Sequence, residues 1–351
     1  MGSIQDAIVI DVSVVSVDTT RTMYGTPAIV GESTYSTKDS PKKYTSLAAV
    51  GTDHGTSSKI YTAAKAIFAQ GCKNLYAVSM TVATAGSPTA TEVETALATL
   101  ANYAKNRLIH GVCLAGISSD STTLTAKLKT FADTNRVIFT VTNPNGATVA
   151  EITAAAPALS SANGYFLAHA DTNQTGDVAA AALGLLSVLK PWVSPYWKEI
   201  VVGVDTFFTP DDGPTLEAAR ANYVIDLGDD VTRMSQAITT KDDGDPKFID
   251  ITRTKYYVAQ VLQNAIAQYR IATEKIPYTA TGLKYIAGEI KGAMESLVSL
   301  GALSEYTVTM PDIDDIDASD KADRRLTGVV IWARNAGDIQ EFTIPLTLEA
   351  I

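Results

Sequence analysis

The chain has 351 residues, of which 46% are hydrophobic, so it is long enough for two or three domains with substantial cores. Its 28 lysines and arginines are outnumbered by 38 aspartates and glutamates, and the formal net charge of -10 argues against nucleic acid or an anionic membrane as the main partner. The opening MGSIQDAIVI lacks the basic start of a secretory signal, and no apolar run approaches the roughly 20 residues of a membrane span, so we expect neither secretion nor membrane insertion.

The first segment with a clear pattern is AIVIDVSVV, residues 7–15. Side chains alternate between the two faces of a strand, which gives this segment one apolar face and one polar face. The apolar face carries Ile8, Ile10, Val12 and Val14. The chain is therefore predicted to begin with a single strand that no neighbouring segment of sequence obviously pairs.

Residues 27–231 alternate between short apolar runs and longer helical patterns. The predicted strands are AIVGE, NLYAVSM, HGVCLAGI, RVIFTVT, GYFLAHA and IVVGVDT, and the predicted helices include SKIYTAAKAIFAQ, TEVETALATLANYAK and TGDVAAAALGLLSVLK. Continuous apolar strands that alternate with helices of this length are typical of an α/β domain with a largely parallel sheet. Cys72 and Cys113 lie inside these apolar patterns without CxxC spacing, so both are predicted to be buried thiols.

Beyond residue 231 the polar segment ITTKDDGDPKF, residues 238–248, suggests a domain boundary. Two long amphipathic helices follow, and the second is expected to stop at Gly301. A strand EYTVTM, an acidic stretch PDIDDIDASDKADRR and a strand GVVIWA come next. A tight turn at residues 335–338 then predicts a hairpin between GVVIWA and the end of the chain.

The end of the chain, EFTIPLTLEAI, residues 341–351, is predicted to be a half-buried strand. Phe342, Ile344, Leu346 and Leu348 share one face of it. Pro345 donates no ladder hydrogen bond, which suits a strand that is paired on one side only. Two terminal strands with one apolar face each indicate strand exchange between subunits, and the alternative is that both pair within their own subunit.

The best enzymatic interpretation places His169, Asp171 and Asp205 at the carboxyl ends of parallel strands, where open α/β sheets bind ligands. No GxSxG, GxGxxG or GxxxxGK[ST] motif supports it. DTNQTGD, from Asp171, begins like a calcium loop but has Ala182 where a bidentate glutamate belongs, so we expect no metal site and no cofactor. Trp192 and Trp197 are interpreted as packing anchors, with a binding role as the alternative.

The region after residue 231 resembles contractile tail sheath proteins. The resemblance lies in three successive runs: AITTKDDGDPKFIDITRTKYYVAQVLQNAI, then TGLKYIAGEIKGAMESLVSLGALSEYTVTM, then PDIDDIDASDKADRRLTGVVIWARNAGDIQEFTIPLTL. They cover about the last 120 residues, and residues 7–15 are a weaker match. The paired arginines that often begin the first long helix are replaced by Arg253 and Lys255, with Thr254 between them, and the central α/β region shows no match.

The resemblance implies an α/β chain with an α+β C-terminal domain: a variable outer α/β domain and an inner sheath domain with terminal strand arms. The expected divisions are an N-terminal arm at 1–20, an outer domain at 21–230, an inner domain at 231–330, and a C-terminal hairpin and arm at 331–351. It also implies a structural subunit rather than an enzyme. Such a subunit polymerises helically around a tail tube through exchanged strands and contracts to drive the tube through an envelope.

The implied partners are further copies of the chain, joined head to tail in stacked hexameric rings rather than by a closed two-fold contact, together with the tail tube, baseplate and tail terminator proteins. The implied location is the host cytoplasm during assembly and then a virion tail or contractile particle. The polar side of the second long helix and the acidic stretch are the predicted tube-facing surfaces, with Lys284, Lys291, Glu295, Asp312, Asp314 and Asp315 as candidates. The alternative function remains a cytoplasmic α/β enzyme or ligand-binding protein that uses His169, Asp171 and Asp205.

Overall fold

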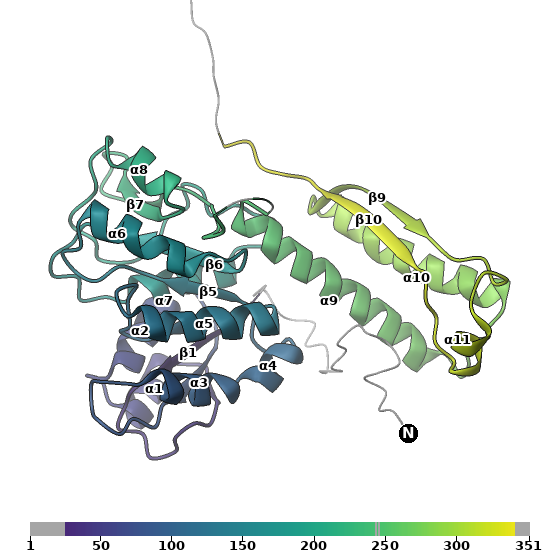
Figure 1. Cartoon of the computed structure of the whole chain (residues 1–351), viewed down its shortest axis with the longest axis horizontal. Coiled ribbons are helices and arrows are strands. Elements are labelled where there is room, and N and C mark those ends of the chain that lie inside the picture. The colour runs from purple at the N-terminus through teal and green to yellow at the C-terminus, as the bar shows by residue number, and fades with distance from the viewer. Residues whose placement is uncertain (1–24, 243, 245, 341–351) are drawn as a thin grey trace, which may run out of the picture.

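The computed structural model of the chain describes residues 25–242, 244 and 246–340. They form an α/β body and an elongated C-terminal unit of long helices and two strands, which extends away from the body (Figure 1). The α/β class predicted from the sequence is confirmed. Within these described ranges, no helix is both long enough and apolar enough to cross a lipid bilayer.

The body is built on an eight-stranded sheet in the order β2-β3-β1-β4-β5-β6-β7-β8. Six strands are parallel: β1 (Pro27–Gly31), β3 (Leu75–Ser79), β4 (Gly111–Leu114), β5 (Ile138–Val141), β6 (Gly164–Ala168) and β7 (Asn222–Asp226). The outermost strands, β2 (Lys42–Tyr44) and β8 (Thr232–Met234), pair antiparallel with their neighbours. The apolar runs correctly predict the first five parallel strands, whereas β7 was not predicted.

The strand predicted at residues 200–206 is wrong. Ile200 and Val204 are buried in the core, which explains the alternating apolar pattern. The backbone of this segment does not form a ladder, however, because the amides of Asp205 and Thr206 donate to the carboxylate of Asp171 instead. Burial of alternate residues was therefore mistaken for β-structure.

Helices cover both faces of the sheet and create two separate hydrophobic cores. One face carries α1 (Leu47–His54), α2 (Lys59–Ala69) and α7 (Val178–Val188). The other carries α3 (Ala90–Ala98), α4 (Ala101–Lys105), α5 (Thr122–Asn135), α6 (Val149–Ala155), the 3-10 helix η2 (Ala156–Leu159) and α8 (Gly213–Ala218). This two-sided cover explains why the central strands are apolar on both faces.

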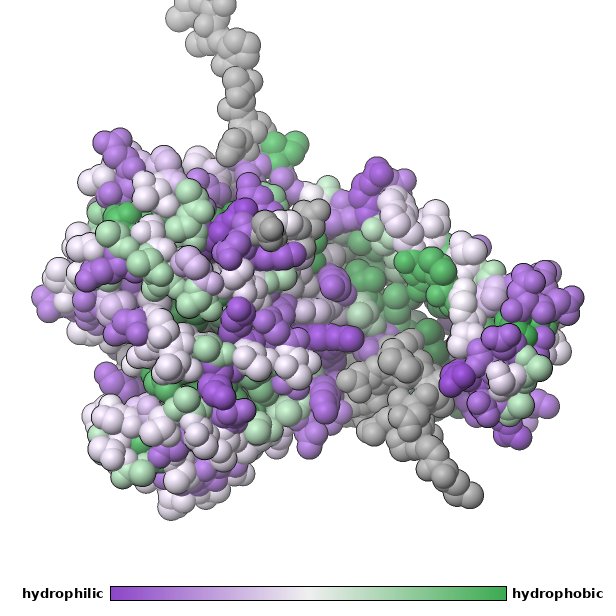
Figure 2. All heavy atoms as spheres, in the orientation of Figure 1, coloured by the Kyte–Doolittle hydropathy of each residue, from purple (hydrophilic) through white to green (hydrophobic). Residues whose placement is uncertain are grey.

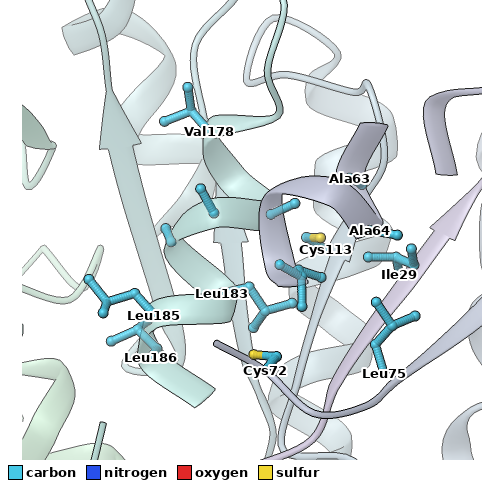
Figure 3. Close-up of a cluster of buried hydrophobic side chains, with 14 of the residues drawn as sticks. Ile29, Ala63, Ala64, Cys72, Leu75, Cys113, Val178, Leu183, Leu185 and Leu186 are labelled. Atoms are coloured by element: carbon cyan, nitrogen blue, oxygen red, sulfur yellow. The ribbon is translucent and has the colours of Figure 1, made fainter. Parts of the chain in front are cut away.

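The first core depends on the close approach of α2 and α7, shown in Figure 3. A Cβ atom at Gly184 of α7 would lie 3.0 Å from the Cα of Ile67, so only glycine allows this helix contact. The Sγ of Cys72 donates to the carbonyl oxygen of Gly184 at 3.3 Å. Burial raises the pKa of Cys72 to about 12 and raises that of Cys113 as well, and both are free buried thiols as predicted.

Both edges of the body sheet are protected against further strand pairing. β2 has only three residues and exposes Lys42 and Lys43, and short lysine-bearing strands are a common way to block an edge. At the other edge, residues 197–200 cover β8: the Trp197 amide donates to Met234 O (2.9 Å), and the Ile200 amide donates to Thr232 O (2.9 Å). A further strand therefore cannot readily pair with either edge of the body sheet.

The body sheet continues beyond residue 230, the predicted end of the outer domain. β8 lies after that point, and the Asn222 side chain hydrogen-bonds both the amide and the carbonyl of Ile238. The Thr240 hydroxyl donates to Leu159 O at 2.6 Å, and Ile249 is buried in the first core. A division between the body and the C-terminal unit therefore fits the start of α9 better than residue 230.

The C-terminal unit consists of α9 (Ile249–Ala272), α10 (Ala280–Ser299), β9 (Leu303–Thr309), α11 (Ala318–Ala322) and β10 (Val330–Asn335). The two long helices were predicted, and Gly301 ends α10 in the expected left-handed conformation, with a φ of 74°. β9 and β10 pair antiparallel, and a third hydrophobic cluster lies between them and the helices. The register shifts between Arg334 and Asn335, because Ser304 of β9 is an extra residue there, and the ladder ends one pair later at Asn335 and Leu303.

The hairpin predicted between GVVIWA and the chain end cannot be compared, because residues 341–351 lie outside the described residues. So do the N-terminal arm candidates Ile8, Ile10, Val12 and Val14 and the C-terminal arm candidates Phe342, Ile344, Pro345, Leu346 and Leu348. Within the part of the chain that is described, the partner of β10 is β9.

His54, the last residue of α1, is buried in a hydrogen-bond network that joins α1 to β2 and to the loop after β1. The Tyr44 hydroxyl donates to Asp53 Oδ2 (2.7 Å), so it accepts from His54 Nε2 (2.9 Å). His54 Nδ1 is then left to accept from the Ser33 hydroxyl (2.8 Å). Burial lowers the pKa of His54 to about 4, since the network fits the neutral imidazole.

The network predicts a pH dependence of stability. Between pH 6.5 and about 4 the unfolded chain binds a proton at His54 that the folded chain excludes, so the free energy of unfolding falls as the pH is lowered. Allowing for solvent screening, we expect a loss of about 1–2 kcal/mol from this group. His54→Gln, which does not titrate, should lose less stability over this range in urea unfolding measured from pH 7 to 4.5. Parallel pH profiles for the two proteins would contradict the assignment.

Candidate functional site

The three strand-end residues singled out from the sequence do not form a catalytic group. His169 and Asp171 are buried, whereas the Asp205 side chain is exposed. The Asp171 carboxylate accepts from the amides of Asp205 and Thr206 and from Gln174 Nε2 (3.1 Å), which uses its lone pairs in holding the loop together. The His169 amide and carbonyl both bond to the Asn143 side chain at 2.9 Å.

An open cleft of about 300 Å³ lies beside these residues, at the carboxyl ends of β4, β5 and β6. Asp177, the N-cap of α7, lies in it, but its carboxylate already accepts from Ala180 N (2.8 Å) and Gly116 N (3.2 Å). Burial raises the pKa of the Asp177 carboxyl. Across the described ranges, no three histidine, cysteine or acidic side chains are placed to hold a metal ion. The carboxylates of Asp171 and Asp177 are thus used in structural hydrogen bonds at this edge, whereas His169 Nδ1 has no hydrogen-bond partner among the described residues.

The region with the clearest structural specialisation is the junction between the body and α9, where Arg253 is inserted. Its guanidinium donates to the carbonyl oxygens of Leu186 and Leu189 at 2.6 Å each, at the C-terminal end of α7. Carbonyls at a helix C-terminus lack partners within the helix and carry the negative end of its dipole, so a cation is favourable there. Burial lowers the pKa of Arg253 to about 10, and nearby Asp250 partly opposes this shift.

Other contacts fix the first turns of α9 against the amino edge of the sheet. The Thr252 hydroxyl donates to Ala162 O (2.8 Å), and the Tyr256 hydroxyl donates to Asn163 Oδ1 (2.6 Å). His110 Nε2 lies 3.3 Å from Gln260 Oε1, so this isolated histidine has a packing role. Because the contacts extend over the first three turns, α9 leaves the body in a fixed direction.

The two-stranded sheet of the C-terminal unit differs from the body sheet in its edges. Neither β9 nor β10 pairs with a third strand among the described residues. One face packs on α9 and α10 through Tyr306, Val308 and Ile331. The opposite face exposes Val330 (60%) and Trp332 (46%), and Arg334 lies over the Trp332 ring. Two strands alone are marginal in water, so the edges of this sheet are suited to additional strands.

Exposed apolar side chains are concentrated on this unit. Figure 2 shows a group of hydrophobic side chains over α9 and α10, between the body and a hydrophilic far end. The large exposed apolar residues of the C-terminal unit are Ile271, Tyr285, Leu300, Val330 and Trp332. Apolar surface gathered on a projecting unit indicates a contact surface for protein.

The predicted tube-facing residues are all exposed, but they form two separate groups. Lys284, Lys291 and Glu295 lie along one stripe of α10, because residues 7 and 11 positions apart return to the same face of a helix. Tyr306 donates to Glu295 Oε2 (3.2 Å), which draws Glu295 toward β9. The second group, Asp312, Asp314 and Asp315, lies in the turn before α11. Within the α10 stripe, Glu295 lies roughly 16 Å along the helix from Lys284.

The roles of Arg253, at the start of α9, and Trp197, at the edge of the body sheet, were not predicted from the sequence. Arg253 was noted only as a departure from a familiar pattern, although a charged residue among apolar helix positions could have signalled a buried partner. Trp197 is not a packing anchor, because it is 50% exposed. Its φ of +55° had no signal in the sequence.

Comparison with known proteins gives matches in structure alone. No protein-family model matches the chain, and no curated protein matches it. The helical sheath of the anti-feeding prophage in its contracted state aligns with a TM-score of 0.72 and 13% identity, over 93% of this chain and 94% of that chain. The sheath complex of PVC, an extracellular contractile injection system, also in its contracted state, aligns with a TM-score of 0.72 and 15% identity, over 93% and 92% of the two chains.

This chain has the fold of contractile sheath proteins. A crystal structure of the sheath tail protein Lin1278 from Listeria innocua gives a TM-score of 0.62 at 10% identity, over 90% of this chain and 96% of that chain. The sheath fold therefore includes the α/β body, where the sequence showed no resemblance. At such low identity, the shared arrangement of helices and strands is what the alignments establish.

The junction leads to a prediction about Arg253. Arg253→Met should lower the free energy of unfolding by about 2–4 kcal/mol, because the buried carbonyls of Leu186 and Leu189 lose charged donors. Lys255→Met, an exposed neighbour on the same helix, should change it by less than about 0.5 kcal/mol. Urea unfolding followed by circular dichroism measures both. Equal losses of stability in the two variants would contradict the proposed role of Arg253 at the end of α7.

Proposed function

We propose that the chain is a structural subunit of a contractile tail sheath, which polymerises helically around a tail tube and shortens to drive the tube through a target envelope. The observation that carries this proposal is the contrast between the two sheets. The body sheet has blocked edges, whereas β9 and β10 form a two-stranded sheet whose outer edges have no partner among the described residues. The shared sheath fold supports the same conclusion.

The terminal arms have the composition needed to complete this sheet. Residues 7–15 and residues 341–351 each alternate apolar and polar side chains, as a strand with one buried face requires. In the proposed assembly, the arms of neighbouring subunits add to β9 and β10, so that main-chain hydrogen bonds supply strength and alternate side chains set the register. Donor and acceptor surfaces then differ, and such head-to-tail contacts generate open helical assemblies.

The remaining partners follow from this function. Further copies of the chain, arranged in stacked hexameric rings, form the sheath, and the tube, baseplate and terminator proteins meet it inside and at its ends. The proposed location is the host cytoplasm during assembly and the particle tail afterwards. The stripe of Lys284, Lys291 and Glu295 and the acidic turn of Asp312, Asp314 and Asp315 are the proposed tube-facing surfaces.

The first prediction from this function concerns the C-terminal arm. Ile344→Asp with Leu346→Asp should abolish tube-like assembly, because each buried aliphatic side chain contributes roughly 1.5–3 kcal/mol at every junction of the polymer. Thr343→Asp with Thr347→Asp places the same charges on the opposite face and should preserve assembly. Negative-stain microscopy reads assembly, and circular dichroism reads the fold of the subunit. A pair of variants that assembles equally well would count against strand donation, and an unfolded Ile344/Leu346 variant would show that the strand belongs to its own subunit.

The second prediction concerns the tube. Reversing Lys284 and Lys291 to glutamate should reduce co-assembly with the tube while leaving sheath-only polymers intact, since individual surface charge contacts are weak and screened by salt. Lys65→Glu with Lys105→Glu changes the net charge equally on the exposed surface of the body and should have no effect. Co-sedimentation with tube at two salt concentrations measures binding. Equal loss in both double variants would attribute the effect to net charge rather than to the α10 stripe.

A further inference from the structure

An aromatic pair, Tyr196 and Trp197, is displayed on the surface in an unfavourable backbone conformation. The rings are stacked, with centroids 5.0 Å apart and an angle of 14° between their planes. Trp197 has a φ of +55°, in the left-handed region that bulky side chains rarely adopt. It is also 50% exposed, so burial does not compensate for the strain. Strained positions of this kind are common where a side chain must be presented to a partner.

The turn that presents the aromatic pair is held firmly. The Lys198 amide donates to Pro195 O (3.0 Å), and the Trp197 amide donates to Met234 O (2.9 Å). Ser194, which is buried, accepts from the Tyr196 amide at 3.2 Å. The indole position is therefore set by the edge of the body sheet and does not depend on a mobile loop.

The same Ser194 also holds the point where the C-terminal arm begins. Gln340 Nε2 donates to Ser194 Oγ at 3.0 Å, and Gln340 is the last described residue of the chain. Eleven residues follow it, with Phe342, Ile344, Leu346 and Leu348 alternating along them. An extended chain covers roughly 3.3 Å per residue, so Ile344 and Leu346 can reach about 13 and 20 Å from Gln340. The aromatic pair, two and three residues after Ser194, lies within that reach.

We propose that in the free subunit the C-terminal arm, residues 341–351, lies against the Tyr196–Trp197 pair and leaves it when a neighbouring subunit accepts the arm as a strand. The inference deepens the proposed function and rests on it, because it assigns the arm a position before donation. An unpaired apolar strand would otherwise be open to indiscriminate pairing. One aromatic pair offers less contact than a ladder of main-chain hydrogen bonds, so transfer to the neighbour is favourable.

Trp197 itself can report the contact. The chain contains three tryptophans, so Trp192→Phe with Trp332→Phe leaves Trp197 as the single fluorophore. Acrylamide quenching is measured on subunits purified as monomers, both full-length and ending at Gln340. The quenching constant of Trp197 should be about half as large in the full-length subunit, since the arm covers much of the remaining exposed surface. Ile344→Asp with Leu346→Asp should raise it to the value of the truncated chain.

The control is a subunit with Trp192→Phe and Trp197→Phe, which retains only Trp332, 46% exposed on β10. Its acrylamide quenching constant should be the same in the full-length and truncated chains. Carbodiimide coupling of Lys198 to Glu349, found by mass spectrometry in the unsubstituted protein, gives a readout that does not depend on tryptophan replacement. Protection of Trp197 from quenching that is unaffected by dilution, together with this cross-link, supports the inference.

Equal quenching of Trp197 in the full-length and truncated chains overturns the inference, as does protection of Trp332 in place of Trp197. Protection that grows with protein concentration would assign the covering arm to a second copy and also overturn it.

These measurements are made on single subunits, so they separate the inference from the proposed function. A subunit that assembles into tubes but shows no protected Trp197 would refute the resting position of the arm and leave strand donation standing. A protected Trp197 in a subunit that never assembles with its own kind would refute the sheath function. Trp197→Gly, which suits the left-handed backbone, should abolish the cross-link while keeping the body folded.

Discussion

The insertion of the Arg253 guanidinium into the end of α7 is the interaction on which the arrangement of the molecule depends. It supplies donors to the carbonyls of Leu186 and Leu189, and it comes from the first turns of α9, the helix that leads into the C-terminal unit. The body core and the direction of α9 are therefore specified together. In the proposed sheath, a force on the C-terminal unit would reach the body through Arg253 and the alanine-rich α7, which is buried along nearly its whole length.

The second constraint is that the edges of the body sheet are blocked, whereas those of the two-stranded sheet are not covered within the described residues. The body blocks one edge with a short lysine-bearing strand and the other with the segment that includes Trp197, whereas the two-stranded sheet has no such cover among the described residues. Because an unpaired strand edge is open to pairing with another chain, this difference would direct the strand exchange of the proposed assembly to the two-stranded sheet. The body remains a folded unit that can vary in sequence without affecting that location.

Much of the architecture could be predicted from the sequence, because buried parallel strands and long amphipathic helices leave periodic patterns. β1, β3, β4, β5 and β6, together with α9 and α10, were predicted for this reason. The pattern failed at residues 200–206, where alternate burial of Ile200 and Val204 reflects a covering segment whose amides bond to a side chain. β7 and β8 were missed because their sequences include polar residues that bond to distant segments, such as Asn222.

The roles of individual side chains were harder to predict than the elements. Asp171 follows a parallel strand, where ligand-binding residues are common, but its carboxylate accepts hydrogen bonds from the amides of Asp205 and Thr206 in a loop. Only the positions of those two amides could reveal this role. Trp197 looks like a core residue by composition, and its exposure follows from a backbone angle that no pattern encodes. Arg253 needed knowledge of where α7 ends relative to α9, two elements more than 60 residues apart in sequence.

The β-bulge in β9, opposite the end of β10, restricts how another strand can align with the two-stranded sheet. The regular ladder of β10 extends from Val330 to Arg334, and the register shift before Asn335 interrupts it. The extra residue is Ser304 of β9, so in the proposed assembly a strand added along the outer edge of β9 meets this irregularity as a stop, which limits how far the strand can slide. Since a slip of one residue would turn an alternating strand so that its apolar side chains point outward, a fixed stop discriminates against wrong alignments. The spacing between successive subunits would then be defined by a backbone irregularity inside one of them, rather than by the side chains that meet across the junction.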